Sequence, residues 1–242
     1  KVGDDLSGRE LVARLKQEGV STKFIAYAKE KPTPYSVLLL TGGERTIINN
    51  HGSSDTFTLD DINLRKLKAR WWYLSLSGES DKMYLPLVQF AKANKIKIAF
   101  NPSGHHIQHK RNDVLESMRD LSVLVMNAGE AAELVQIPFQ KEREVFKRLD
   151  NLLSPGIVAV TDGPNGVVVS DGQRLYRAGI FRENKVVDRT GAGDSFGSGF
   201  VAVLARGGTI EEAIRFASAN ATAVVERVGA TEGILRKGDF EK

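Results

Sequence analysis

Hydrophobic positions follow a strand-and-helix alternation from residue 70 onward. Short apolar runs typical of buried strands are separated by stretches in which apolar residues recur with the helical period. The strand-like runs are residues 71–76, 97–100, 122–126 and 156–161, and the helical stretches are residues 84–91, 128–135 and 210–228. This alternation favours a parallel sheet that is covered by helices on both faces.

The first residues of the chain predict a separate helix. Ser7 and Glu10 have the spacing of a capping box, and Gly19 is placed to end the helix that they begin. The expected apolar face of this helix consists of Leu11, Val12 and Leu15.

Three β-type runs then follow one another without a helix between them. They cover residues 23–29, 35–41 and 45–50, with prolines and Gly42-Gly43 between them. We expect a small antiparallel flap over residues 23–50, and an α/β domain formed by residues 1–22 and 51–242. The flap would expose Phe24, Val37, Leu39 and Ile47. Because an exposed apolar edge is usually paired, we predict a homodimer through the flap.

Composition narrows the class of protein. The chain is 41% hydrophobic and 26% charged, which is typical of a globular domain with a sizeable core. It has no cysteine, which excludes disulfides and thiolate metal sites and favours a cytoplasmic location. No apolar run is long enough to span a membrane. The 34 basic and 30 acidic residues are scattered without a basic stripe, so we expect a small anionic ligand rather than nucleic acid or a membrane.

Polar and glycine-rich residues follow the predicted strands. They are Ser77-Gly78, Asn101-Pro102-Ser103, Asn127-x-x-Glu130, Asp162-Gly163 and the segment from Asp188 to Asp194. Because ligands of open α/β sheets bind beyond the carboxyl ends of the strands, these segments predict one shared cleft.

Gly191-Ala192-Gly193 stands directly before Asp194 at the start of a predicted helix. Unpaired N–H groups and the helix dipole attract an anion there, and small residues let phosphate oxygens come close. A carboxylate beside that anion could take the proton from an attacking hydroxyl. The spacing alone allows equally that Asp194 merely caps the helix.

Residues 188–194, Asp-Arg-Thr-Gly-Ala-Gly-Asp, resemble the C-terminal signature D-T-x-G-A-G-D of the ribokinase (PfkB) family of ATP-dependent carbohydrate and nucleoside kinases. Arg189 departs from that signature, which more often has a small residue at this position. Further matches in the same order are VGDDLSG, GERTI, NPS, Asn127-x-x-Glu130, VTDGPNGVVV and VERVGA. The resemblance also implies that an N-terminal segment with substrate-binding residues is missing from this sequence.

This resemblance implies a three-layer α/β/α sandwich with a small β-strand lid that excludes water from the site. It implies a kinase that uses ATP and Mg²⁺ to phosphorylate a primary hydroxyl of a small sugar. A nucleoside kinase of the adenosine type is the alternative with the same chemistry. The alternative from another functional class is a catalytically silent relative that binds nucleotide or sugar and acts as an interaction partner.

The resemblance also assigns residue roles. Asp194 would be the catalytic base, and Gly191, Ala192 and Gly193 would form the anion hole. Glu130 would organise Mg²⁺ through water together with Asn127, although an ordinary helix cap remains open for that pair. The expected nucleotide contacts are Asn127, Thr161, Asp162, Gly163, Gly166 and Asn220. Asn220 could equally be a solvated helix residue.

Asp188 and Thr190, with carbonyls of the turn at residues 228–230, resemble the monovalent-cation loop of some relatives. Bound K⁺ would stiffen the anion hole, and turn capping by Asp188 is the alternative.

The cluster His105-His106-x-x-His109 has metal-ligating side chains. Its polar surroundings lack the apolar face of a helix, so we expect a solvent-exposed loop rather than a Zn²⁺ site. Trp71 and Trp72 are expected to open a buried strand, where core packing is favoured over stacking on a base.

Overall fold

The computed structural model describes residues 1–41 and 44–236. The chain divides into two compact units. The first consists of Lys1–Lys68 and Leu76–Leu87, and the second of Ala69–Ser75 and Val88–Lys242. The predicted flap, residues 23–50, belongs to the first unit. No helix in the described part of the chain is long and apolar enough to cross a membrane.

Helix α1 (Leu6–Gln17) opens the first unit, and its cap differs from the prediction. The N-cap is Asp5, whose Oδ1 accepts a hydrogen bond from the backbone N–H of Gly8 at 2.8 Å. The capping box at Ser7 is therefore wrong. The Asp5 carboxylate also accepts hydrogen bonds from the backbone N–H and hydroxyl of Thr33, which fixes it at the helix start. Of the predicted apolar face, Val12 is buried and Leu11 is exposed.

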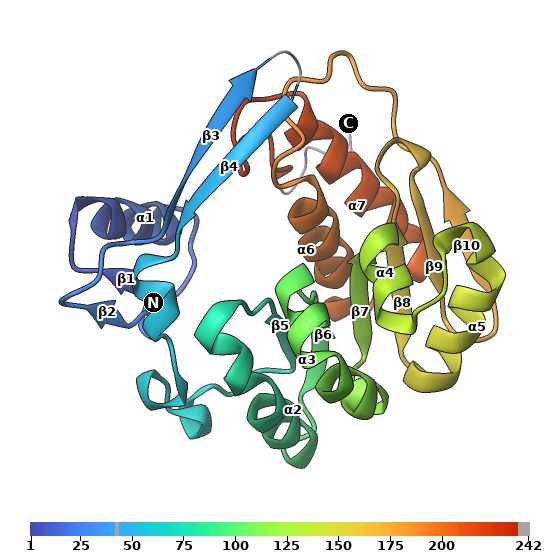
Figure 1. The fold of residues 1–242 in the computed structure, drawn as a ribbon, viewed down its shortest axis with the longest axis horizontal. Coiled ribbons are helices and arrows are strands. Elements are labelled where there is room, and N and C mark those ends of the chain that lie inside the picture. Colours follow the sequence, from blue (N-terminus) through green and yellow to red (C-terminus); the bar gives the residue numbers. More distant parts are fainter. Residues whose placement is uncertain (42–43, 237–242) are drawn as a thin grey trace. The chain divides into compact units, whose positions relative to one another are not determined.

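The predicted three-stranded flap is only partly correct. Strands β3 (Tyr35–Thr41) and β4 (Glu44–Asn50) form an antiparallel hairpin, drawn in blue in Figure 1. The turn predicted at residues 42–43 lies outside the described residues. Strand β2 (Tyr27–Ala28) instead pairs in parallel with β1 (Val2–Gly3). Proline residues follow β2, and their missing N–H groups favour a break before the hairpin.

Short 3-10 helices complete the first unit. They are Gly52–Thr56, Leu59–Asp61, Leu64–Lys66 and Gly78–Met83.

A six-stranded sheet forms the middle of the second unit (Figure 1), in the order β10-β9-β8-β7-β6-β5. Its strands are β5 (Trp71–Leu74), β6 (Lys97–Phe100), β7 (Val123–Asn127), β8 (Ile157–Thr161), β9 (Val167–Ser170) and β10 (Leu175–Ala178). The predicted parallel pairing is confirmed for β5 to β8. Strand β9 pairs antiparallel with both β8 and β10, because only short loops join β8 to β9 and β9 to β10.

Helices lie on both faces of this sheet. Helices α6 (Ala192–Ala205) and α7 (Ile210–Val225) bury Phe200 and Ala217 against Val123, Val125 and Val169. Successive side chains of a strand point to opposite faces, so Leu124 and Met126 lie on the other face. Helices α4 (Ala128–Val135) and α5 (Glu142–Leu153) contact β7 and β8 there. The three-layer arrangement predicted from the sequence is confirmed within this unit.

The helix expected at residues 84–91 is confirmed as α2 (Tyr84–Ala93). Its predicted buried positions, Tyr84, Leu87, Val88 and Ala91, are each at most 4% exposed. The loop expected at the histidine cluster is wrong, because His105, His106 and His109 lie in α3 (Gly104–Ser117). Ser103 caps this helix, and His106 and Ile107 supply the buried contacts that the sequence pattern did not show. Among the described residues, no group of three or more His, Cys, Asp or Glu side chains is placed so that it could hold a metal ion.

Trp71 and Trp72 begin β5 as predicted. Trp71 packs against the core cluster beneath α6 and α7. Trp72 stacks on Phe90, with ring centroids 5.8 Å apart. Both rings therefore contribute to packing.

Candidate active site

The carboxyl ends of β7 and β8 place the first site residues side by side. Asn127, the last residue of β7, is the register partner of Thr161, the last residue of β8. Asn127 Oδ1 accepts the backbone N–H of Glu130 at 2.9 Å, and Glu130 Oε2 accepts the backbone N–H of Asn127 at 2.8 Å. These reciprocal bonds form a capping box on α4. The pair therefore caps the helix, and this fixes the Glu130 carboxylate at the edge of the sheet.

The surroundings of Glu130 disfavour the charged form of its carboxyl group. Partial burial raises the pKa of its carboxyl group, the hydrogen bonds with Asn127 act in the opposite direction, and the negative charges of Asp194 and Glu133 raise the pKa further. Asp194 is thus close enough for its charge to act on Glu130.

The turn before α6 is tied down at two places. Asp188 Oδ1 accepts hydrogen bonds from the backbone N–H of Thr190 at 2.9 Å and from its hydroxyl at 2.7 Å. Asp188 Oδ2 accepts the backbone N–H of Gly229 at 3.4 Å. Asp188 therefore caps this turn, which was the alternative to the cation site, and the turn at residues 228–230 lies beside it as expected.

Gly191 is the N-cap of α6 and has a left-handed backbone, with φ of +81°. A Cβ atom at Gly191 would lie 2.3 Å from the carbonyl oxygen of Ala230. Only glycine fits this position, both for its backbone angle and for the space around it. The first N–H groups of α6 are consequently presented at a turn without bulky side chains, as an anion site requires.

Asp194 lies in the first turn of α6, and its side chain is exposed. No side chain caps this helix, and within the described residues the Asp194 carboxylate accepts no hydrogen bond. The capping alternative for Asp194 therefore has no bond to support it. The carboxylate is instead available to solvent or to a ligand.

Tyr73 of β5 lies against the same helix one turn further on. A Cβ atom at Gly197 would come within 2.5 Å of the Tyr73 hydroxyl, so Gly197 lets this ring pack closely. Desolvation and the negative charge of Asp194 raise the pKa of Tyr73 to about 12. The Tyr73 phenol is therefore harder to deprotonate than that of an ordinary tyrosine.

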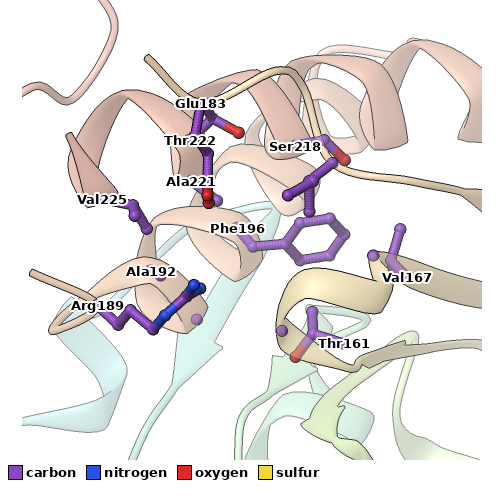
Figure 2. Close-up of a pocket in the computed structure, with 14 residues that line it drawn as sticks. Thr161, Val167, Glu183, Arg189, Ala192, Phe196, Ser218, Ala221, Thr222 and Val225 are labelled. Atoms are coloured by element: carbon purple, nitrogen blue, oxygen red, sulfur yellow. The ribbon is translucent and has the colours of Figure 1, made fainter. Parts of the chain in front are cut away.

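A pocket opens between the start of α6, the β8–β9 loop and α7 (Figure 2). Its walls include Thr161, Gly163 and Gly166 from β8 and the loop after it, and Ala192 and Gly193 from the start of α6. The remaining lining residues are Val167, Ile180, Glu183, Arg189, Phe196, Ser218, Ala221, Thr222 and Val225. Its volume is about 110 Å³, smaller than the ~300–1,000 Å³ of a whole ligand site, so it fits one moiety of a larger ligand.

Comparison with known proteins decides the family. The profile of the pfkB family of carbohydrate kinases matches residues 1–237. The chain belongs to this family. An uncharacterized sugar kinase of Archaeoglobus fulgidus is 27% identical, and the match covers 99% of this chain and 94% of that protein. The adenosine kinase of Saccharomyces cerevisiae is 25% identical, with 94% and 71% covered.

The fold agrees with this membership. The solved structure of Arabidopsis thaliana ribokinase complexed with ribose and ATP matches with a TM-score of 0.83 at 22% identity, covering 99% of this chain and 78% of that one. The ribokinase-like α/β fold expected from the sequence motifs is therefore confirmed. The pfkB relatives include both sugar and nucleoside kinases, so family membership alone leaves the acceptor open.

Three predicted nucleotide contacts of this pfkB-family chain, Asn127, Asp162 and Asn220, do not line the pocket. Asp162 Oδ2 accepts a hydrogen bond from Asn165 Nδ2 within its own loop. Asn220 is 3% exposed, so a solvated Asn220 is wrong. Its Nδ2 donates to the carbonyl oxygen of Ser195, and its Oδ1 accepts the backbone N–H of Leu235. Asn220 thus links α7 to α6 and to the C-terminal segment.

The pocket also contains residues that the sequence reasoning missed. On α7 they are Ser218, Ala221, Thr222 and Val225, which follow one another at helical spacing. These four residues lie on α7 next to the buried stripe of Ala213 and Ala217. The helical spacing of the sequence could therefore have identified them as residues on the neighbouring face of this helix. Glu183 and Ile180 lie in an irregular loop, where sequence spacing gives no comparable signal.

Proposed function

We propose that this chain is a kinase that transfers the γ-phosphoryl group of ATP to a primary hydroxyl of a small sugar. The observation that carries the proposal is the exposed carboxylate of Asp194, which follows the glycine turn directly and caps nothing among the described residues. An acid placed at an anion site without a structural task is best explained as a base for the attacking hydroxyl.

Each part of the site then has a task. Asp194 takes the proton of the attacking hydroxyl as the oxygen bonds to the γ-phosphorus, and the bond to ADP breaks. The N–H groups at Gly191, Ala192 and Gly193 stabilise the negative charge on the transferred group. The apolar walls of the pocket, which include Phe196, hold the nucleoside part of ATP.

The residues present also fit Mg²⁺. Mg²⁺ keeps several waters, so few protein carboxylates are needed to position it. The Asp194 charge that raises the pKa of Glu130 would be offset by a divalent cation nearby. Glu130 would hold the ion through water, and Mg²⁺ supplies neutralisation of phosphate charge when bound.

A thermal-shift screen tests the acceptor. Sugars and nucleosides are added to the protein in the presence of a non-hydrolysable ATP analogue and Mg²⁺. We expect the melting temperature to rise most with a small sugar. A rise with adenosine-type nucleosides alone would favour the nucleoside kinase, which relatives such as the yeast adenosine kinase make the second candidate. If a sugar or nucleoside binds but is not phosphorylated when ATP replaces the analogue, the result would favour the catalytically silent relative.

We further propose a monovalent-cation site beside the turn. Asp188, Thr190 and the 228–230 segment lie together, since Gly229 bonds to Asp188 and the Ala230 carbonyl oxygen adjoins Gly191. Their carboxylate, hydroxyl and carbonyl oxygens suit K⁺. Turnover is expected to rise when K⁺ replaces a bulky organic cation at constant ionic strength. Equal rates in the two salts would leave Asp188 as a turn cap only.

The homodimer remains a proposal that rests on the β3–β4 hairpin. Val37, Leu39, Ile47 and Ile48 of this hairpin are each 44–54% exposed. Val37 is paired with Ile48, whereas Ile47 is paired with Leu38, so apolar side chains occupy both faces of the hairpin. We expect light scattering at micromolar concentration to give the mass of a dimer, and Leu39→Lys to shift it toward one chain. A single-chain mass for the unmodified protein would contradict this proposal.

A further inference from the structure

The pocket beside α6 has two charged side chains of opposite sign in its lining, Arg189 and Glu183. Figure 2 shows them at different edges of the pocket, with Arg189 extending past Ala192 toward the side where Thr161 lies. The other lining residues are apolar, glycine or neutral polar. The two ends of the pocket therefore differ in charge, and the positively charged side chain of Arg189 lies at the end formed by the glycine turn.

The backbone of Arg189 is fixed from both sides. Its neighbours are joined by the two hydrogen bonds from Thr190 to Asp188 Oδ1. The backbone N–H of Asp188 donates to the carbonyl oxygen of Val225 at 3.2 Å, and the carbonyl oxygen of Arg189 accepts the N–H of Ala192 at 3.4 Å. The side chain thus starts from a constrained point at the mouth of the anion site.

The guanidinium of Arg189 has no acidic partner in the described part of the chain. Arg177, by contrast, pairs with Glu142 through both of its terminal nitrogens. An exposed arginine that lines a pocket, and that has no carboxylate to pair with, keeps its donors for a ligand. The planar fork of a guanidinium matches two oxygens of a phosphate group.

We propose that Arg189 binds oxygens of the β-phosphate of the nucleotide, beside the backbone N–H groups of the glycine turn. The carboxylate of Glu183 repels phosphate at the other edge, so the pair of charges sets the direction in which the nucleotide lies. This inference rests on the proposed function, because it requires that the pocket bind a nucleotide. It assigns a ligand contact to the residue by which this chain departs from the family signature.

Calorimetric titration of ADP and AMP at fixed salt tests the assignment. Arg189→Ala is expected to weaken ADP binding by about 10–100-fold, the effect of losing a charged, bidentate hydrogen-bonding partner. AMP lacks the β-phosphate, so its affinity should change by less than about threefold. Arg189→Lys keeps the charge but not the fork, and it is expected to give an intermediate loss of ADP affinity.

Arg182→Ala is the matched control. Arg182 is an exposed arginine of the same loop that does not line the pocket, so its removal should leave both affinities unchanged. Unchanged ADP affinity of Arg189→Ala, or equal losses of affinity for ADP and AMP, would overturn the role of Arg189 but not the proposed function. A wild-type protein that binds neither nucleotide would overturn the proposed function as well.

Discussion

Replacing Asp194 with asparagine is expected to lower kcat by about 10²–10⁴-fold, the usual contribution of a positioned base. Asparagine keeps the size of the side chain and removes its basicity. Since the N-cap of α6 is Gly191 and no side chain caps that helix, the substitution removes no hydrogen bond seen in the described structure. Affinities for ATP and for the acceptor should therefore stay near those of the wild type.

Glu211→Gln is a matched control for this variant. Glu211 is an exposed acid in the first turn of α7, so it has the same relation to a helix dipole without lining the pocket beside α6. Its replacement should leave kcat unchanged. Thermal melts of both variants separate lost chemistry from lost folding, and a well-folded Asp194→Asn protein with wild-type kcat would end the assignment of the base.

The second large effect is expected for Gly191→Ala. An alanine there must adopt a left-handed backbone, at a cost of about 1–3 kcal/mol. Its Cβ would also lie 2.3 Å from a backbone oxygen of Ala230, which cannot move as freely as a side-chain end. The turn must shift, and misplacing one donor of an anion hole typically costs about 10²–10³ in kcat. We expect a lower melting temperature together with this loss of rate.

Gly193→Ala is the matched stability control in the same turn. A Cβ atom at Gly193 meets no protein atom within 4 Å, and this glycine has no left-handed φ. Its melting temperature should therefore remain that of the wild type. Equal melting temperatures for Gly191→Ala and Gly193→Ala would contradict the role assigned to the Gly191 backbone.

The sequence predicted those strands and turns that are determined by the properties of a few consecutive residues. The apolar runs of β6, β7 and β8 and the glycine turn of α6 were predictable because burial and backbone freedom are local properties of these residues. The cap at Asp5 was missed because its carboxylate is held by Thr33, which is distant in sequence. The pairing of β2 with β1 likewise depends on a tertiary contact that no local run reveals.

For the candidate site, the sequence predicted where the residues lie along the strands and helices better than it predicted the directions and partners of their side chains. Motif spacing located Asp194 and the pair Asn127 and Glu130, since each lies at a strand end or helix start. The direction of Arg189 cannot be read from spacing, because it depends on how its turn is held against Gly229 and Val225. The burial of Asn220 could not be predicted, because its partners Ser195 and Leu235 are brought to it only by tertiary packing.

Phosphorus NMR of the reaction mixture tests whether this chain transfers the γ-phosphoryl group of ATP to a primary hydroxyl. The protein is incubated with ATP, Mg²⁺ and the sugar that stabilises it most. We predict that ADP and a new phosphomonoester appear in equal amounts, and that the ester phosphorus couples to methylene protons. ADP formed without an ester, or no reaction with any sugar or nucleoside of the panel, would show that this chain does not catalyse the proposed transfer.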